Sequence, residues 1–262
     1  ILASTGQVRI DVAGALTIAA PVQATGLILE SDDSVTSTSG AMMRIGDLGI
    51  SVLTNAVFGV GSTGDVTLQG PITVLDTDAA AIVTNTISAA GTTTVAGRFY
   101  SPHAGSTTFS GKTGVVVGGP TQLGSTKLAA DGSAFTILDH NLALLSPAGL
   151  VTIANVPGTD ATPFAVQATN IISIDAVDDV TIEGSVFAGT IYGNPSALTA
   201  ASVLPSISIR GLAAVNVTAT GSLRTQAYQT APDKTTNPLV GKITIRDASQ
   251  VNAAGPISAD GA

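Results

Sequence analysis

The side chains with the greatest capacity for chemistry are few in this sequence. His103 and His140 are the only histidines, and each could act as a base or as a metal ligand. They occur as Ser-Pro-His and Asp-His-Asn, without the paired spacing of a zinc site. We therefore interpret both histidines as residues of corners or loops.

Closely spaced carboxylates could bind calcium together with backbone carbonyl groups. Three acidic pairs have this spacing: Asp32 and Asp33, Asp76 and Asp78, and Asp178 and Asp179. The Gly-Gly-x-Gly-x-Asp nonapeptide of calcium-binding β-rolls is missing from the sequence. Phosphate-binding loops and nucleophile elbows are missing too. We therefore assign no catalytic, cofactor-binding or metal-ligating residue and expect no cofactor.

The elements that would position these residues follow from a repeat. Apolar or very small side chains recur at offsets 0, 2, 8, 10, 12, 14 and 16 in six stretches. Alternation with period two indicates strands with one buried face, separated by short polar corners. A solenoid shows this pattern because each coil buries its apolar face against its neighbours. The six rows begin at Val8, Leu27, Phe58, Ile172, Ile207 and Ile243 and align without gaps.

Weaker rows begin at Ile87, Thr107 and Ala143. Together, the rows predict an all-β, single-chain, right-handed parallel β-helix of roughly ten coils. The right hand follows from the general preference of parallel crossovers. Helical periodicity with a capping signal is lacking, apart from an expected helical turn around Ser196 to Ala201. The run from Ala227 to Pro238 is expected to form a polar loop.

Composition favours the same narrow core. Hydrophobic residues make up 44% of the chain and aromatic residues only 3%, while 29 glycines suit tight corners. Enzymes of this length usually use aromatic side chains to fill a thick core and line a pocket. We therefore expect a lumen of Val, Ile, Leu and Ala and no enzymatic activity.

Outward positions of the expected coils carry mixed side chains. Asp11 and Asp175 share a column with Arg210 and Arg246. Glycosidases need two carboxylates about the scissile bond, whereas a column of both charges is typical of a solvated face with ion pairs between coils.

Two short motifs are open to functional interpretation. The cluster of Thr92, Thr93 and Thr94 is similar to the threonine rows of ice-binding solenoids, but we expect the outward residues to change type from row to row. The sequence Asn216-Val217-Thr218 matches a glycosylation site, yet Val217 occupies an inward column. We assign neither ice binding nor glycosylation.

No charge run or proline-rich linker separates the rows, which predicts a single β-solenoid domain over residues 1–262. The sequence starts at Ile1 and stops soon after Asp260 within the repeat, so we expect a fragment of a longer chain. Because open coil ends expose strand edges, we expect flanking coils or self-association, end to end or lateral.

Charge and cysteine content exclude several classes of function. A net charge of -8 with 10 Lys and Arg residues argues against binding to nucleic acid, whose phosphates require a basic face. The lack of cysteine excludes disulfides and thiolate metal sites and is compatible with an extracellular protein. No apolar run is long enough to span a membrane.

The stretches Gly64–Gly70 (GDVTLQG) and Asp179–Gly184 (DVTIEG) resemble repeats of filamentous haemagglutinin-like exoproteins and other giant bacterial surface proteins. The resemblance covers most of the chain. It implies a right-handed parallel β-helix within a long extracellular shaft, adhesin or cell-surface filament.

The sequence therefore favours a structural, non-enzymatic module that acts outside the cell. The alternative is a carbohydrate-active or polysaccharide-binding β-helix protein that contacts surface glycans through loops near Tyr100, Tyr192 and Tyr228.

Overall fold

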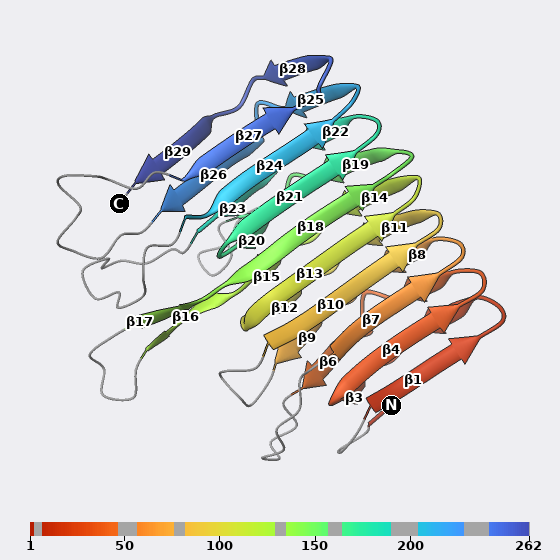
Figure 1. The fold of residues 1–262 in the computed structure, drawn as a ribbon. Coiled ribbons are helices and arrows are strands. Elements are labelled where there is room, and N and C mark those ends of the chain that lie inside the picture. The colour runs from red at the N-terminus through yellow and green to blue at the C-terminus, as the bar shows by residue number, and fades with distance from the viewer. Residues whose placement is uncertain are drawn as a thin grey trace.

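The computed structural model describes residues 1–2, 7–46, 57–75, 82–128, 135–156, 164–189, 204–227 and 241–261. Within these ranges every regular element is a β-strand. The strands form three parallel sheets of nine strands each and one separate antiparallel pair. Figure 1 shows the strands of each sheet stacked along one axis, with the N- and C-terminal coils at opposite ends.

The chain visits the three sheets in turn, and one strand from each sheet makes one coil. The first sheet contains β1 (Gln7–Val12), β4 (Gly26–Ser31), β7 (Val57–Ser62), β10 (Ile82–Ala89), β13 (Ala104–Gly111), β18 (His140–Ser146), β21 (Ile171–Ala176), β24 (Ser206–Gly211) and β27 (Lys242–Arg246). The second contains β2 (Leu16–Ile18), β5 (Val35–Ser37), β8 (Val66–Leu68), β11 (Thr92–Val95), β14 (Gly114–Val117), β19 (Leu150–Ile153), β22 (Val180–Ile182), β25 (Ala214–Val217) and β28 (Gln250–Ala253). The third contains β3 (Val22–Ala24), β6 (Met43–Gly46), β9 (Ile72–Leu75), β12 (Phe99–Ser101), β15 (Thr121–Leu123), β20 (Val166–Ala168), β23 (Ser185–Ala188), β26 (Ser222–Ala227) and β29 (Ile257–Gly261).

This arrangement confirms the predicted parallel β-helix. We number its coils 1 to 9 from the N-terminus, one fewer than the roughly ten expected. With strands about 4.8 Å apart, the stack is about 40 Å long. The first corner joins the first sheet to the second, the second corner joins the second to the third, and the third corner returns the chain to the first sheet.

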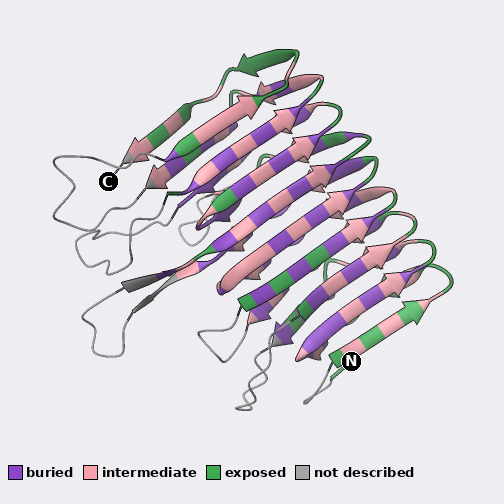
Figure 2. Cartoon of the chain, in the orientation of Figure 1, coloured by how far each residue is buried: buried purple, intermediate pink, exposed green. Residues whose placement is uncertain are grey.

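Stacked aliphatic columns fill the lumen, as the repeat predicts. Val8 pairs with Leu27 and Leu27 with Phe58, and farther along the same column Ile172 pairs with Ile207. All but Val8 are fully buried. Figure 2 shows the resulting alternation of buried and partly exposed residues along the strands of the inner coils. Branched side chains suit this pleated, half-buried surface.

Two of the gap-free rows were aligned wrongly in their last positions. These are the rows that begin at Leu27 and Ile207. Met43 pairs with Val22 and Ile72, and Leu223 pairs with Val186. Each of the two rows therefore has two more residues in its second corner than the rows it was aligned with. A tight turn absorbs these residues in each case: the Ala41 amide donates to the Thr38 carbonyl, and the Gly221 amide to the Thr218 carbonyl, both at 3.0 Å.

Two weaker rows were also displaced, whereas the row at Thr107 is confirmed. In coil 4 the row was expected to begin at Ile87, but Asn85 lies opposite Phe58. The expected row was displaced because the first inward position of this coil holds a polar residue. In coil 6, Leu142 and Leu144 point inward instead of Ala143 and Leu145, because the first corner of this coil is one residue longer. A search for apolar residues at fixed offsets detects neither the polar inward residue nor the longer corner.

Most of the variation in coil length falls at the third corner. Here the hairpin of β16 (Ser125–Leu128) and β17 (Phe135–Leu138) is inserted between β15 and β18. The expected helical turn at 196–201 lies outside the described residues, as does the expected polar loop except for Ala227, which ends β26. Among the residues described, no helix could cross a membrane.

Candidate functional sites

A polar cluster interrupts the apolar lumen in coils 4 to 6. Its centre is His140, the first residue of β18, whose side chain is fully buried. The ring Nδ1 lies 2.7 Å from the carbonyl oxygen of His103, and Nε2 lies 2.8 Å from Thr107 Oγ1. His103 lies in the third corner, as expected. The interpretation of His140 as a corner residue was wrong, since it occupies an inward strand position.

The hydrogen bonds of this cluster run in one direction. A carbonyl oxygen only accepts, so Nδ1 of His140 carries a proton, and in the neutral ring Nε2 accepts from the Thr107 hydroxyl. Thr107 Oγ1 in turn accepts from Asn85 Nδ2 at 3.0 Å, and the same amide lies 3.3 Å from Ser101 Oγ. This direction of bonding is that of the neutral imidazole.

Burial lowers the pKa of His140 to about 4, so the ring is neutral near pH 7. The His140 backbone amide donates to Thr169 Oγ1 at 2.8 Å, and Thr169 donates to the Leu138 carbonyl at 2.7 Å. Leu138 ends β17, so the cluster fastens the base of the hairpin to coil 6. Neither ring nitrogen of His140 is free to bind a metal.

The described acidic pairs lie in the first corner. Asp32 and Asp33 belong to coil 2 and Asp178 and Asp179 to coil 7, so the two pairs are far apart along the axis, whereas Asp76 and Asp78 lie outside the described residues. Asp179 Oδ1 accepts from the Ala214 amide of the next coil at 2.9 Å. Within the described part of the chain, no group of three His, Asp or Glu residues could hold a metal ion.

A charged column crosses the outer face of the first sheet at its C-terminal end. Arg210 lies 2.9 Å from Asp175 Oδ1 and 3.1 Å from Asp247 Oδ2, and the bond to Asp175 is the main cause that raises the pKa of Arg210. Beside these residues is a shallow hollow of about 310 Å³, lined partly by Leu145 and Pro147. Since one guanidinium holds both carboxylates, neither is placed as a free acid or base.

The second sheet carries an unexpected threonine ladder on its outer face. Thr94 lies in this ladder, whereas Thr93 points inward and donates to the Ser110 carbonyl at 2.6 Å, and Thr92 contacts Thr113 at the corner. The expectation that outward residues change type from row to row is therefore wrong for this column. Its members in order are Thr17, Thr36, Thr67, Thr94, Val116, Thr152, Thr181, Asn216 and Asn252.

The ladder places hydroxyl groups at the strand spacing of about 4.8 Å. The sequon residue Asn216 belongs to it, and its Oδ1 accepts from Asn252 Nδ2 at 2.8 Å. The sequence signal was the recurring Val-Thr-Ile or Val-Thr-Leu tripeptide, as in Val66–Leu68 and Val180–Ile182.

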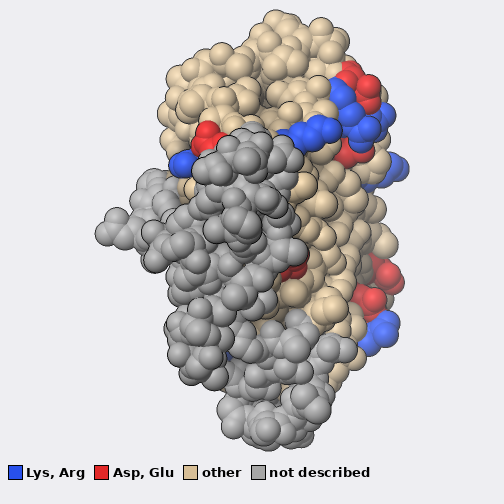
Figure 3. Space-filling view, turned by 60° about the vertical axis from the view of Figure 1, so that its left-hand side comes forward, with Lys and Arg blue, Asp and Glu red and all other residues tan. Residues whose placement is uncertain are grey.

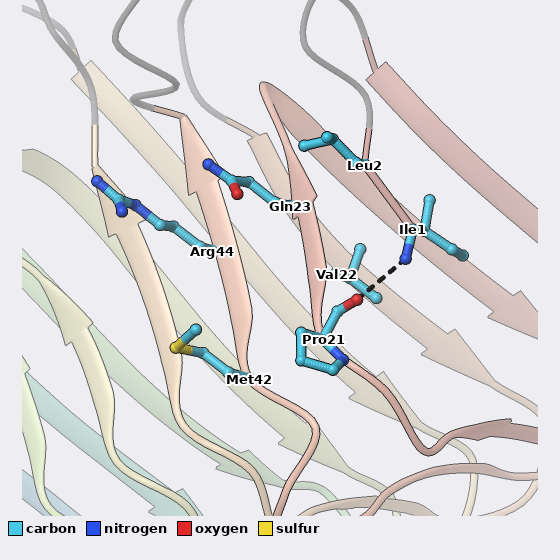
Figure 4. A pocket seen from close by; sticks show the side chains of 7 residues that line it. All are labelled: Ile1, Leu2, Pro21, Val22, Gln23, Met42 and Arg44. Carbon is cyan, nitrogen blue, oxygen red and sulfur yellow. Dashed lines mark hydrogen bonds between the residues drawn. The ribbon is translucent and has the colours of Figure 1, made fainter.

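The third sheet has a partly apolar hollow over coils 1 and 2, of about 330 Å³ (Figure 4). Met42 and Arg44 line one side, and Ile1 and Leu2 the other. The Ile1 amino group donates to the Pro21 carbonyl at 3.0 Å.

Tyr100 projects from β12 on this sheet, with the Arg98 guanidinium 5.0 Å from its ring centre. The loops of Tyr192 and Tyr228 lie outside the described residues. Of the three tyrosines considered for glycan contact, the structure therefore places only Tyr100, and a guanidinium already covers part of its ring.

Comparisons with known proteins name no relative. No family model, curated protein or solved structure matches the chain. Its function is therefore inferred from the fold and from the sites described above.

Proposed function

We propose that the chain is a structural, non-enzymatic module of an extracellular shaft, adhesin or cell-surface filament. The observation that carries this proposal is the lumen, in which inward side chains stack in register through nine coils. Burying one Val or Ile side chain contributes about 1.5 to 3 kcal/mol. In a solenoid these contributions accumulate from coil to coil, which produces a stiff and stable rod.

The residues with chemical potential support the same proposal through their contacts. The His140 ring bonds to the His103 carbonyl and to Thr107 of the preceding coil. Asp179 accepts from the backbone of the next coil, and Arg210 joins three coils through two carboxylates. Each group thus holds neighbouring segments together. An extracellular location is further supported by the lack of cysteine and by the resemblance of the repeats to filamentous haemagglutinin-like exoproteins.

The alternative of a carbohydrate-active or glycan-binding protein has one feature in its favour, the hollow beside Asp175. β-Helix enzymes that cleave polysaccharides require carboxylates free to transfer protons. Here Asp175 and Asp247 are both bonded to Arg210. The structural proposal therefore accounts better for this column.

A screen against acidic and neutral polysaccharides tests the proposal. We expect neither turnover nor saturable binding by the wild-type chain or by Asp175→Asn. Turnover that is lost in Asp175→Asn, while Thr244→Ala on the same sheet retains it, would replace the structural proposal with the enzymatic one. Saturable binding without turnover would favour the glycan-binding alternative.

A further inference from the structure

The outer face of the first sheet changes in charge along the axis of the coils. On the strands of coils 3 to 6 (β7, β10, β13 and β18) no outward residue is charged. Figure 3 shows charged side chains near both ends of one side of the molecule, with an uncharged stretch between them. The charged outward residues form a negative group, Arg9, Asp11 and Glu30 on coils 1 and 2, and a positive group, Asp175, Arg210, Lys242 and Arg246 on coils 7 to 9.

The uncharged stretch contains a hollow of about 210 Å³ next to Glu30, over the outward residues Gly59 and Gly61 of coil 3. Neither glycine has a positive φ. A Cβ atom would lie 3.8 Å from Ile28 Cγ1 at Gly59 and 3.9 Å from Glu30 Cγ at Gly61, and both are ordinary contacts. The fold therefore does not require glycine at these positions, although glycine weakens a strand. Glycine in a strand often marks the close approach of another backbone or of a ligand.

Outward residues on either side of coil 5 complement one another. Val57 in coil 3 is 37% exposed, and Ile171 in coil 7, in the same outward column, is 40% exposed. Glu30 in coil 2 and Arg210 in coil 8 share a second outward column. A two-fold rotation about an axis along the strand of coil 5 turns each column onto itself and exchanges coil 3 with coil 7 and coil 2 with coil 8. It therefore places Val57 opposite Ile171, and Glu30 opposite Arg210, of a second copy.

We propose that the outer face of the first sheet docks on the same face of a second copy, with the coils of the two copies running in opposite directions. The two-fold axis passes beside Thr108 of coil 5. The proposal rests on the structural function proposed above and identifies a second copy of this chain as the partner. The negative group of each copy then meets the positive group of the other, whereas copies running in the same direction would bring like groups together. Both copies use the same patch, as in most symmetric dimers.

The hollow over coil 3 receives the side chains that face it. In the docked arrangement Gly61 faces Asp175, and Glu30 faces Arg210, whose guanidinium lies 2.9 Å from Asp175 Oδ1. A guanidinium has five N–H donors, and the bonds to Asp175 and Asp247 use two of them. Arg210 can therefore donate to Glu30 across the interface and keep both bonds within its own chain. This contact gives the two outward glycines a role, since they leave room for the facing side chains.

The size and flatness of the face suit a dimer. With strands about 4.8 Å apart and about 3.3 Å per residue, the face of coils 2 to 8 measures about 30 by 20 Å. Two copies would bury about 1,200 Å², which is the lower limit for a specific, stable interface. Sheets that pack face to face keep their strands within about 30° of each other, as an axis along the strands requires. Close approach is favoured by the small outward residues of coils 4 and 5, which are Thr84, Thr86, Ser88, Ser106, Thr108 and Ser110.

A charge placed at the two-fold axis tests the interface. Sedimentation velocity of the wild-type chain over a range of concentrations should show a dimer. Thr108→Arg should lower the association constant about tenfold or more, because the guanidinium groups of both copies meet at the axis. Thr181→Arg, the same change on the outer face of the second sheet, should dimerise as the wild type does. A wild-type chain that stays monomeric, or a Thr108→Arg variant that dimerises like the wild type, would overturn the proposal.

Cross-linking tests the direction of the two copies, because the chain contains no cysteine. Ile28, Thr108 and Ser208 share one outward column. A bismaleimide that spans the sheet spacing of about 10 Å should join two copies of Thr108→Cys. It should not join two copies of Ser208→Cys, which lie about 30 Å apart, but it should join Ser208→Cys to Ile28→Cys when the two variants are mixed.

Cross-linking of Ser208→Cys alone would show copies that run in the same direction and would overturn the docked arrangement. Failure of Thr108→Cys to cross-link would overturn it too, because the axis passes beside this residue. Circular dichroism of each variant checks that the β-helix is retained. None of these results bears on the polysaccharide screen, so the docking proposal and the structural function can fail separately.

Discussion

Two stretches of the same lumen are built from opposite kinds of side chain. In coils 7 and 8 the first inward column holds Ile172 and Ile207, both fully buried. In coils 4 and 5 the same column holds Asn85 and Thr107, which are equally buried. The β-helix therefore fixes which positions point inward, and in coils 4 and 5 the polar side chains of Asn85 and Thr107 bond to one another there.

The two stretches depend on different interactions. The aliphatic stretch is stabilised by removal of apolar surface from water, and each side chain contributes largely by itself. The polar stretch depends on mutual hydrogen bonding, since a buried group that loses its partner carries its full cost of desolvation. We therefore expect the aliphatic lumen to respond to charge and size, and the polar lumen to respond to protonation.

The largest expected effect comes from a charge in the aliphatic stretch. Ile182 lies inward on β22 and is fully buried, whereas the adjacent Thr181 lies in the outward ladder. Ile182→Asp should lower the free energy of unfolding by about 4 kcal/mol or more, because it buries a carboxylate without a partner. Thr181→Asp should cost less than about 1 kcal/mol. Urea unfolding followed by circular dichroism measures both, and equal effects would contradict the inward placement of Ile182.

Inward apolar residues could be predicted from the sequence wherever the corners between strands kept one length. The row from Ile172 places every inward residue correctly because its apolar pattern and the pleat coincide. The row in coil 4 slipped by two residues because Asn85 occupies an inward position. The polar cluster could not be predicted, since it joins Asn85, Thr107 and His140 from three separate coils, and their register depends on corner lengths that the apolar pattern does not fix.

The polar stretch should be sensitive to acid. The pKa of His140 is lowered to about 4 from 6.5, so the unfolded chain binds more protons between these values and stability falls as the pH drops through this window. Between pH 7 and pH 5 we expect a loss of about 2 kcal/mol. Protonated Nε2 would also stop accepting from Thr107. Hydrogen exchange of β16 and β17 at the two pH values should show the hairpin opening first.

Two neighbouring titratable groups bear on this measurement. The hydrogen bond to the His103 carbonyl raises the pKa of His140, and the weaker electrostatic effect of the His103 side chain lowers it. Burial raises the pKa of Asp139, so protonation of Asp139 acts on stability in the opposite direction to protonation of His140. His140→Leu is the matched control, with lower stability at pH 7 because Thr107 loses its acceptor, but a flatter response to acid. An equal acid response in that variant would assign the effect to other groups.

The smallest expected difference separates two adjacent threonines in β11. Thr93 is fully buried and donates to the Ser110 carbonyl, while Thr94 faces outward beside Val116 in the ladder. Thr93→Val should lower the free energy of unfolding by about 1 kcal/mol, because one buried hydrogen bond is lost at nearly constant volume. Thr94→Val should change it by less than about 0.5 kcal/mol, because valine already occupies the next position of the column. The difference between the urea midpoints of the two variants compares the contribution to stability of a hydroxyl inside the lumen with that of a hydroxyl on the outer face. A larger loss of stability for Thr94→Val than for Thr93→Val would show that the ladder itself stabilises the stack.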